Sequence, residues 1–122
     1  MSDIAGTIER YITLWNETDA DARVRGIAEV FAPNATYTDP LADVAGHAGI
    51  GAVISGAQGQ FAGFTFKLLT AVDSNHHIAR FSWELIPAGG GESVVIGSDV
   101  AIFGEDGKIS GVYGFLDKVP AA

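Results

Sequence analysis

Two aspartates occupy positions where the neighbouring residue types would disfavour an ordinary solvated carboxylate. The first, Asp99, lies in the middle of a predicted strand, and the same face of that strand carries Val95, Ala101 and Phe103. Burial on such a face disfavours the charged form, so the acid would be kept neutral and could donate a hydrogen bond. A carboxylate that reaches a backbone N–H group or solvent at a sheet edge is the alternative, and the residues alone leave both open.

The second aspartate, Asp39, ends a short predicted strand over residues 35–39, which Pro40 stops. Alternation along a strand places Tyr37 and Asp39 on one face. If that face points inward, Asp39 is an acid held in an apolar cavity, and otherwise it is an ordinary turn carboxylate before a proline. Tyr11 lies on the apolar stripe of a predicted helix. Its hydroxyl either finds a hydrogen-bond partner within the packed core or reaches the same cavity.

Other kinds of chemistry find no support in the sequence. The absence of cysteine excludes disulfides and thiolate metal sites. His76 and His77 are adjacent, so on a strand they point to opposite faces and do not chelate one metal ion. No P-loop, dinucleotide-binding or nucleophile-elbow motif is present. We therefore expect neither a cofactor nor a metal.

Charge and composition narrow the class of partner. Seven basic and fifteen acidic residues give a net charge of −8, which argues against binding to nucleic acid or to anionic membranes. With 48% hydrophobic residues, the 122-residue chain can fill a core as one domain, residues 1–122. No apolar run is long enough to span a bilayer, and the first residues do not resemble a signal peptide. A cytoplasmic location is expected.

Apolar periodicity predicts the elements that must position these side chains. Helical spacing predicts three helices: one from a Ser2 or Asp3 cap through Trp15, one from a Thr18 or Asp19 cap to Pro33 with Val24 and Ala28 inward, and one at about residues 47–60. A period of two predicts strands at about 64–70, 77–86, 93–103 and 108–118. A loop is expected over 41–46 and a turn over 73–75.

This order predicts an α+β fold, in which three N-terminal helices pack on a strongly curved, mainly antiparallel sheet that encloses a pocket. Some of the large apolar side chains must line such a pocket. The candidates are Trp15, Phe31, Tyr37, Ile54, Phe81, Trp83, Tyr113 and Phe115. The strand near residue 100 is apolar on both faces, so its outer face needs cover, and a homodimer through the sheet is expected.

Several segments together carry a family resemblance. They are Arg10–Leu14, Phe31–Thr36, Asp39–Leu41, Ser98–Phe103 and Asp106–Ile109. Over nearly its whole length the chain resembles the nuclear transport factor 2-like (NTF2-like) superfamily, and within it the ketosteroid isomerases and the SnoaL-like polyketide cyclases. The resemblance implies a cone-shaped fold around a pocket.

The resemblance to the isomerases also implies roles for three residues. Tyr11 falls on the oxyanion-hole tyrosine, Asp39 on the general base, and Asp99 on the aspartic acid that such enzymes keep neutral in an apolar site. The implied reaction removes a proton next to a carbonyl and returns it to another carbon. The chain departs from the pattern at Phe31 and Ile54, which fall near positions where some isomerases carry tyrosines.

Three functions follow as hypotheses. The first is a cofactor-free isomerase of a hydrophobic, steroid-like ketone. The second is a SnoaL-like polyketide cyclase or lyase that uses Asp99 as acid and base. The third is a non-catalytic protein that binds a small hydrophobic ligand. An epoxide hydrolase would want an arginine beside the carboxylates, whereas Arg80 is expected on the face opposite Phe81 and Trp83.

Overall fold

The computed structural model describes residues 3–120, which form three helices and one seven-stranded sheet. The helices are α1 (Ile4–Asn16), α2 (Ala20–Val30) and α3 (Gly46–Gln60). The strands are β1 (Phe31–Asp39), β2 (Ala42–Ala45), β3 (Phe64–Leu68), β4 (Asp73–Asn75), β5 (Ile78–Pro87), β6 (Val95–Phe103) and β7 (Ile109–Lys118). No helix within residues 3–120 has the length and apolar character to cross a membrane.

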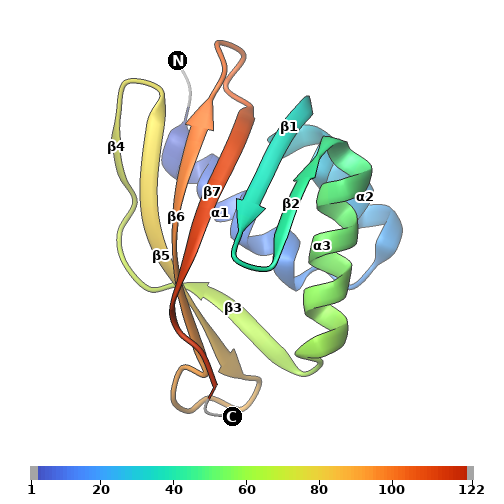
Figure 1. Cartoon of the computed structure of the whole chain (residues 1–122), viewed down its shortest axis with the longest axis vertical. Helices are drawn as coiled ribbons and strands as arrows, with labels where there is room; N and C mark the ends of the chain where they lie inside the picture. Colours follow the sequence, from blue (N-terminus) through green and yellow to red (C-terminus); the bar gives the residue numbers. More distant parts are fainter. Residues whose placement is uncertain (1–2, 121–122) are drawn as a thin grey trace.

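The strands form one curved sheet that does not close on itself. Their order is β2-β1-β7-β6-β5-β3, and β4 adds to β5. Only the β1–β7 pair is parallel among the described strands. In Figure 1, α3 lies beside β1 and β2, on the opposite side of the molecule from β4 and β5. The predicted α+β architecture, with helices on a curved and mainly antiparallel sheet, is confirmed.

Helix α1 crosses the inner face of the sheet and carries Tyr11. Its N-terminus is capped by Asp3, whose carboxylate accepts the N–H of Gly6 at 2.9 Å. At the other end, the Asn16 side chain exchanges two hydrogen bonds with the backbone of Phe66 in β3, at 2.8 and 2.9 Å. Both ends are thus fixed, and the predicted apolar stripe of α1 is buried in the core.

Helix α2 ends earlier than the sequence predicts. It is capped by Asp19 as expected, but it stops at Val30, and Phe31 already begins β1. Ile27 and Val30 are buried, whereas Val24 is 66% exposed. The prediction that Val24 and Ala28 face inward is therefore wrong, because α2 packs at the margin of the molecule and buries only a narrow stripe.

Two short strands replace expected irregular segments. The predicted loop over 41–46 contains β2, which pairs with β1, and the predicted turn over 73–75 is β4, which pairs with β5. The turn lies instead at His76 and His77, where His76 adopts a φ of 47°. The three residues of β4 are too few to show the alternation by which strands are recognised, and β2 follows directly on the turn at residues 40–41.

A bulge in β7 inverts the expected orientation of its second half. Phe103 pairs with Ile109 and the preceding residue of β6, Ile102, pairs with Gly111, so Ser110 is an extra residue on β7. After it, alternate residues starting at Val112 point inward. Tyr113 and Phe115 consequently lie on the outer face, 42% and 68% exposed, and their prediction as pocket residues is wrong.

Candidate active site

The two aspartates come from neighbouring positions across the sheet. Thr38 of β1 pairs with Tyr113, and Asp99 of β6 pairs with Gly114, so that Asp39, Gly114 and Asp99 follow one another on three adjacent strands. With a strand spacing of about 4.8 Å, the Cα atoms of the two aspartates lie roughly 10 Å apart. Both side chains therefore point to the same region on the inner face of the sheet.

Gly114 provides the space that these carboxyl groups occupy. A Cβ atom at this position would lie 2.5 Å from Oδ1 of Asp99 and 3.6 Å from Cβ of Asp39. The first distance is far below van der Waals contact. A glycine between the two aspartates is thus a steric requirement of the site.

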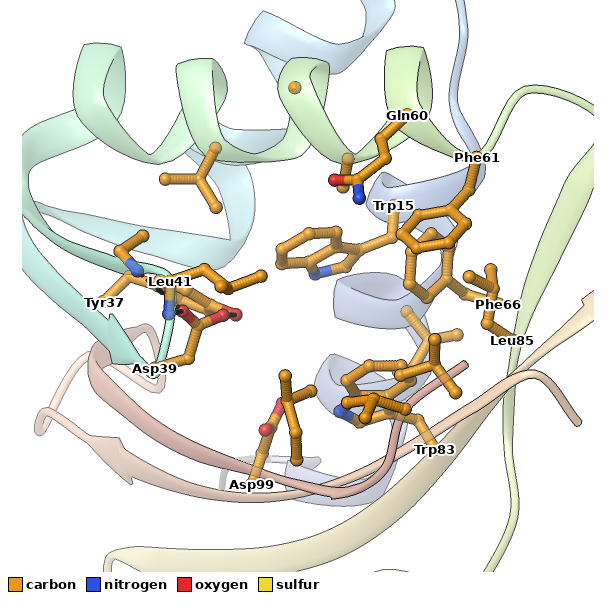
Figure 2. Close-up of a pocket in the computed structure, with 18 of the residues that line it drawn as sticks. Trp15, Tyr37, Asp39, Leu41, Gln60, Phe61, Phe66, Trp83, Leu85 and Asp99 are labelled. Carbon is orange, nitrogen blue, oxygen red and sulfur yellow. Dashed lines mark hydrogen bonds between the residues drawn. The ribbon is translucent and has the colours of Figure 1, made fainter. Parts of the chain in front are cut away.

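A cavity of about 520 Å³ lies between the helices and the sheet at this place. Its volume is within the range of roughly 300–1,000 Å³ found for small-molecule sites. Tyr11, Asp39 and Asp99 all line it. Figure 2 shows the two carboxyl groups at one end, with Trp15, Phe61, Phe66 and Trp83 extending the wall away from them. The site is a largely apolar chamber with its two carboxyl groups gathered at one end.

Asp99 is held in the environment that favours a neutral acid. Its side chain is only 5% exposed, and burial raises the pKa of Asp99 to about 7. Hydrogen bonding from the Trp83 indole and the Tyr11 hydroxyl opposes this shift of the pKa, while the negative charge of Asp39 adds to it. Near neutral pH the group can therefore serve either as a hydrogen-bond donor or as an ionised base.

Tyr11 is placed so that its hydroxyl can donate into the cavity. It contacts Oδ2 of Asp99 at 3.3 Å, which is long for an O–H···O bond and leaves the donor open to a stronger acceptor. Burial raises the pKa of Tyr11 well above its usual value, so the hydroxyl stays protonated. Edge-on contacts with Phe31 and Phe81, both with ring centroids 5.8 Å away, fix the ring.

Asp39 is surrounded by donors that favour an ionised carboxylate. The Tyr37 hydroxyl donates to Oδ2 at 2.7 Å. The backbone N–H groups of Leu41, in the turn after β1, and of Ala42, the first residue of β2, both donate to Oδ1 at 2.8 Å. Hydrogen bonds to a carboxylate stabilise its charge. The two aspartates therefore stand in opposite environments within one cavity.

The predicted pocket residues divide into three groups. Trp15, Tyr37 and Trp83 line the cavity. Phe31, Ile54 and Phe81 are buried in the packed core outside its lining, where Phe31 and Phe81 support Tyr11. Tyr113 and Phe115 lie on the far face of the sheet, as the bulge in β7 requires.

Sequence reasoning missed other parts of the wall, among them Phe61 and Gln60, which line the cavity. Leu116, which the family resemblance puts near the substrate pocket of some isomerases, lines it too, because the bulge turned it inward. Gly97 is a further requirement, since a Cβ atom there would meet the Trp83 ring at 2.3 Å. The sequence did contain a signal for this requirement, since Gly97 and Asp99 lie on the same face of the strand. A glycine on such a face leaves room for a large neighbouring side chain.

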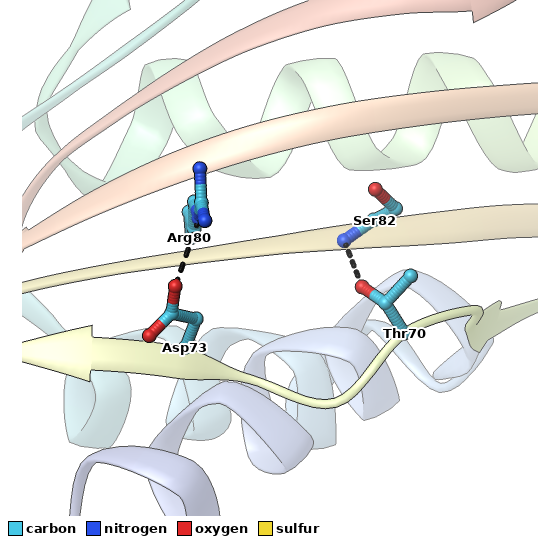
Figure 3. A network of polar contacts seen from close by, with 4 residues as sticks. All are labelled: Thr70, Asp73, Arg80 and Ser82. Carbon is cyan, nitrogen blue, oxygen red and sulfur yellow. Dashed lines mark hydrogen bonds and ion pairs between the residues drawn. The ribbon is translucent and has the colours of Figure 1, made fainter.

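Among the residues that the structure describes, no cationic side chain and no cluster of metal ligands lines the cavity. Within residues 3–120, no group of three or more histidine, aspartate or glutamate side chains is arranged to hold a metal ion. Figure 3 shows Arg80 on the edge formed by β4 and β5, where it pairs with Asp73 at 3.0 Å. Arg80 is exposed there, and no arginine of the described part of the chain lines the cavity.

Helices that cover a curved sheet and enclose an apolar pocket define the NTF2-like class of fold. The model of the SnoaL-like domain matches residues 8–112, and the chain belongs to this family. No curated protein matches the chain significantly by sequence.

Solved structures agree with this assignment. A SnoaL-like family protein from Agrobacterium tumefaciens str. C58, proposed to be an isomerase, is 37% identical; the match has a TM-score of 0.86 and covers 92% of this chain and 95% of that one. An NTF2-like protein of unknown function from Exiguobacterium sp. 255-15 is 19% identical over 91% and 98% of the two chains, with a TM-score of 0.72. A protein from Sinorhizobium meliloti, proposed to be a polyketide cyclase, is 19% identical over 89% and 93%, with a TM-score of 0.69. The last two support the fold alone.

Proposed function

We propose that this protein is a cofactor-free isomerase of the ketosteroid isomerase type, which shifts a proton next to the carbonyl of a hydrophobic, steroid-like ketone. The observation that carries the proposal is the contrast between two carboxyl groups in one apolar cavity. Asp39 accepts three hydrogen bonds that favour its charge, while burial raises the pKa of Asp99 to about 7. Contrasting surroundings of this kind are how enzymes give two nearby carboxyl groups different roles.

In the proposed reaction the substrate carbonyl oxygen lies between Tyr11 and neutral Asp99. Asp39 removes a proton from the adjacent carbon, and the electron pair of that C–H bond moves into a dienolate whose oxygen accepts hydrogen bonds from both donors. The proton then returns from Asp39 to a different carbon, so the reaction needs no oxidant or reductant. Preorganised donors of this kind contribute about 3–4 kcal/mol each to transition-state stabilisation.

Two further observations support an isomerase. The cavity wall is largely apolar and aromatic beyond the carboxyl groups, which suits a flat hydrophobic substrate. The 37% identical protein from Agrobacterium tumefaciens is itself proposed to be an isomerase.

A SnoaL-like polyketide cyclase or lyase is the second candidate. It is favoured by the pKa of Asp99 near 7, because a group that titrates at the working pH can both take and give a proton. In this alternative Asp99 is the acid and base, and Tyr11 orients it. The fold-level likeness to a protein proposed to be a polyketide cyclase agrees with this candidate.

The test is conversion of a 5-ene-3-ketosteroid to its conjugated 4-ene isomer, followed by ultraviolet absorbance. We expect turnover by the wild-type protein and a loss of about 10²–10⁴-fold in kcat for Asp39→Asn, the usual contribution of a general base. Asp43→Asn is the matched control, because Asp43 is exposed on β2 and does not line the cavity.

Unchanged turnover in Asp39→Asn contradicts the proposal. Absence of turnover in the wild-type protein together with tight binding of a phenolic steroid also contradicts it, and favours ligand binding or a different substrate.

A further inference from the structure

The two oxygen atoms of Asp39 are not equivalent. Oδ1 accepts two backbone N–H groups, and Oδ2 accepts the Tyr37 hydroxyl at 2.7 Å. We propose that Tyr37 is a positioning residue that holds the Asp39 carboxylate with a single acceptor site free for proton transfer. This inference rests on the proposed function of Asp39 as the base.

Counting lone pairs identifies the acceptor. An ionised carboxylate has about four lone-pair sites, two on each oxygen. The N–H groups of Leu41 and Ala42 occupy both sites of Oδ1, and the Tyr37 hydroxyl occupies one site of Oδ2. The remaining site belongs to Oδ2. The same oxygen therefore receives the proton and gives it back.

Tyr37 is suited to donate to this oxygen throughout the cycle. Its side chain is only 3% exposed, and burial, together with the hydrogen bond to Asp39, raises the pKa of Tyr37 far above its usual value. The hydroxyl therefore remains protonated whether or not Asp39 carries a proton. Alternation along β1 places residues 37 and 39 on one face, so the hydrogen bond is built into the strand.

The ring of Tyr37 is fixed by its packing in the core. Its ring packs against Trp15, with the ring centroids 5.7 Å apart. The two backbone donors belong to the β1–β2 hairpin, Leu41 to its turn and Ala42 to the first position of β2. Both donate to Oδ1, whereas Tyr37 donates to Oδ2, the oxygen with the free site. We therefore assign the orientation of the reacting oxygen to Tyr37.

The test does not require turnover. Full-length protein labelled with ¹³C at aspartate carboxyl groups is titrated by NMR, and the Asp39 signal is assigned from its loss in Asp39→Asn. In Tyr37→Phe the carboxylate loses one donor, so we expect the Asp39 signal to titrate about one pH unit higher than in the wild type, a tenfold change in the protonation equilibrium. Tyr113→Phe removes an exposed hydroxyl from the outer face and is expected to leave the titration unchanged.

A second measurement links the same variant to catalysis. If the ketosteroid is turned over, the acidic limb of the kcat/KM profile of Tyr37→Phe moves to higher pH by the same amount as the NMR titration. A shifted NMR titration in a protein without isomerase activity supports the role of Tyr37 and overturns only the isomerase proposal. An Asp39 titration that is identical in the wild type and in folded Tyr37→Phe overturns the role of Tyr37, whatever the activity.

Discussion

The buried carboxyl of Asp99 is a source of instability once it ionises. An aspartate in an unfolded chain titrates near pH 4, whereas burial raises the pKa of Asp99 to about 7 in the folded protein. Between these values the folded state binds a proton that the unfolded state has lost, so stability falls as the pH rises. Above about pH 7 the cost is complete, at up to about 4 kcal/mol.

Replacing this carboxyl by an amide removes the titration. We expect Asp99→Asn to be more stable than the wild type at pH 8, by about 2–4 kcal/mol, and the difference to shrink steadily towards pH 4. Urea unfolding of both proteins across this range measures it. Asp43→Asn, at an exposed position, should show no such trend. A difference between Asp99→Asn and the wild type that does not change with pH would contradict burial as the cause.

Among the helices, α3 forms although its glycines are poor helix formers, because its apolar residues are buried. The helix was predicted at 47–60 and is observed at Gly46–Gln60, although it contains several glycines. Ile50 and Ile54, both buried, anchor it to the core, and this burial outweighs a propensity cost of about 1 kcal/mol for each interior glycine. A stripe of large apolar residues was therefore a sufficient signal here.

The glycines of α3 offer a matched pair of substitutions. A Cβ atom at Gly51 would contact Ile27 at an ordinary 3.5 Å, so Gly51→Ala should stabilise the protein by about 0.5–1 kcal/mol through helix propensity. A Cβ atom at Gly49 would approach Cβ of Val44 to 3.1 Å, so Gly49→Ala should gain less or lose stability. Thermal unfolding compares the two, and an equal gain from both would show that the contact with β2 is not tight.

In strand β7 the alternation of side chains predicts the wrong orientation for the second half of the strand. Alternation from Ile109 predicted Tyr113 and Phe115 inward, and the bulge at Ser110 reverses this. A bulge depends on how two strands pair, and the residues of one strand do not reveal it. On β6, which has no extra residue near Asp99, the same reasoning placed Asp99 on the buried face as observed.

At the scale of the whole molecule, the order of elements and the curved sheet could be predicted, and so could a cavity between sheet and helices. The family resemblance singled out Tyr11 and Asp99, which lie 88 residues apart and meet in the structure. The shared face of Tyr37 and Asp39 could be predicted, but their hydrogen bond depends on side-chain contacts and the space at Gly114 on strand register, so neither of these could. The homodimer stays a prediction, for which the exposed Val100, Tyr113 and Phe115 on the outer face are the candidate surface.

The roles proposed for Asp99, as a neutral donor, and for Asp39, as the base, predict how turnover depends on pH. We expect kcat/KM for the 5-ene-3-ketosteroid to fall as the pH rises through about 7, because the proton of Asp99 is lost there. In Asp99→Asn, which keeps a donor that does not titrate, this fall should be absent. A wild-type activity that rises through pH 7 would contradict these roles, because it would make ionised Asp99 the base.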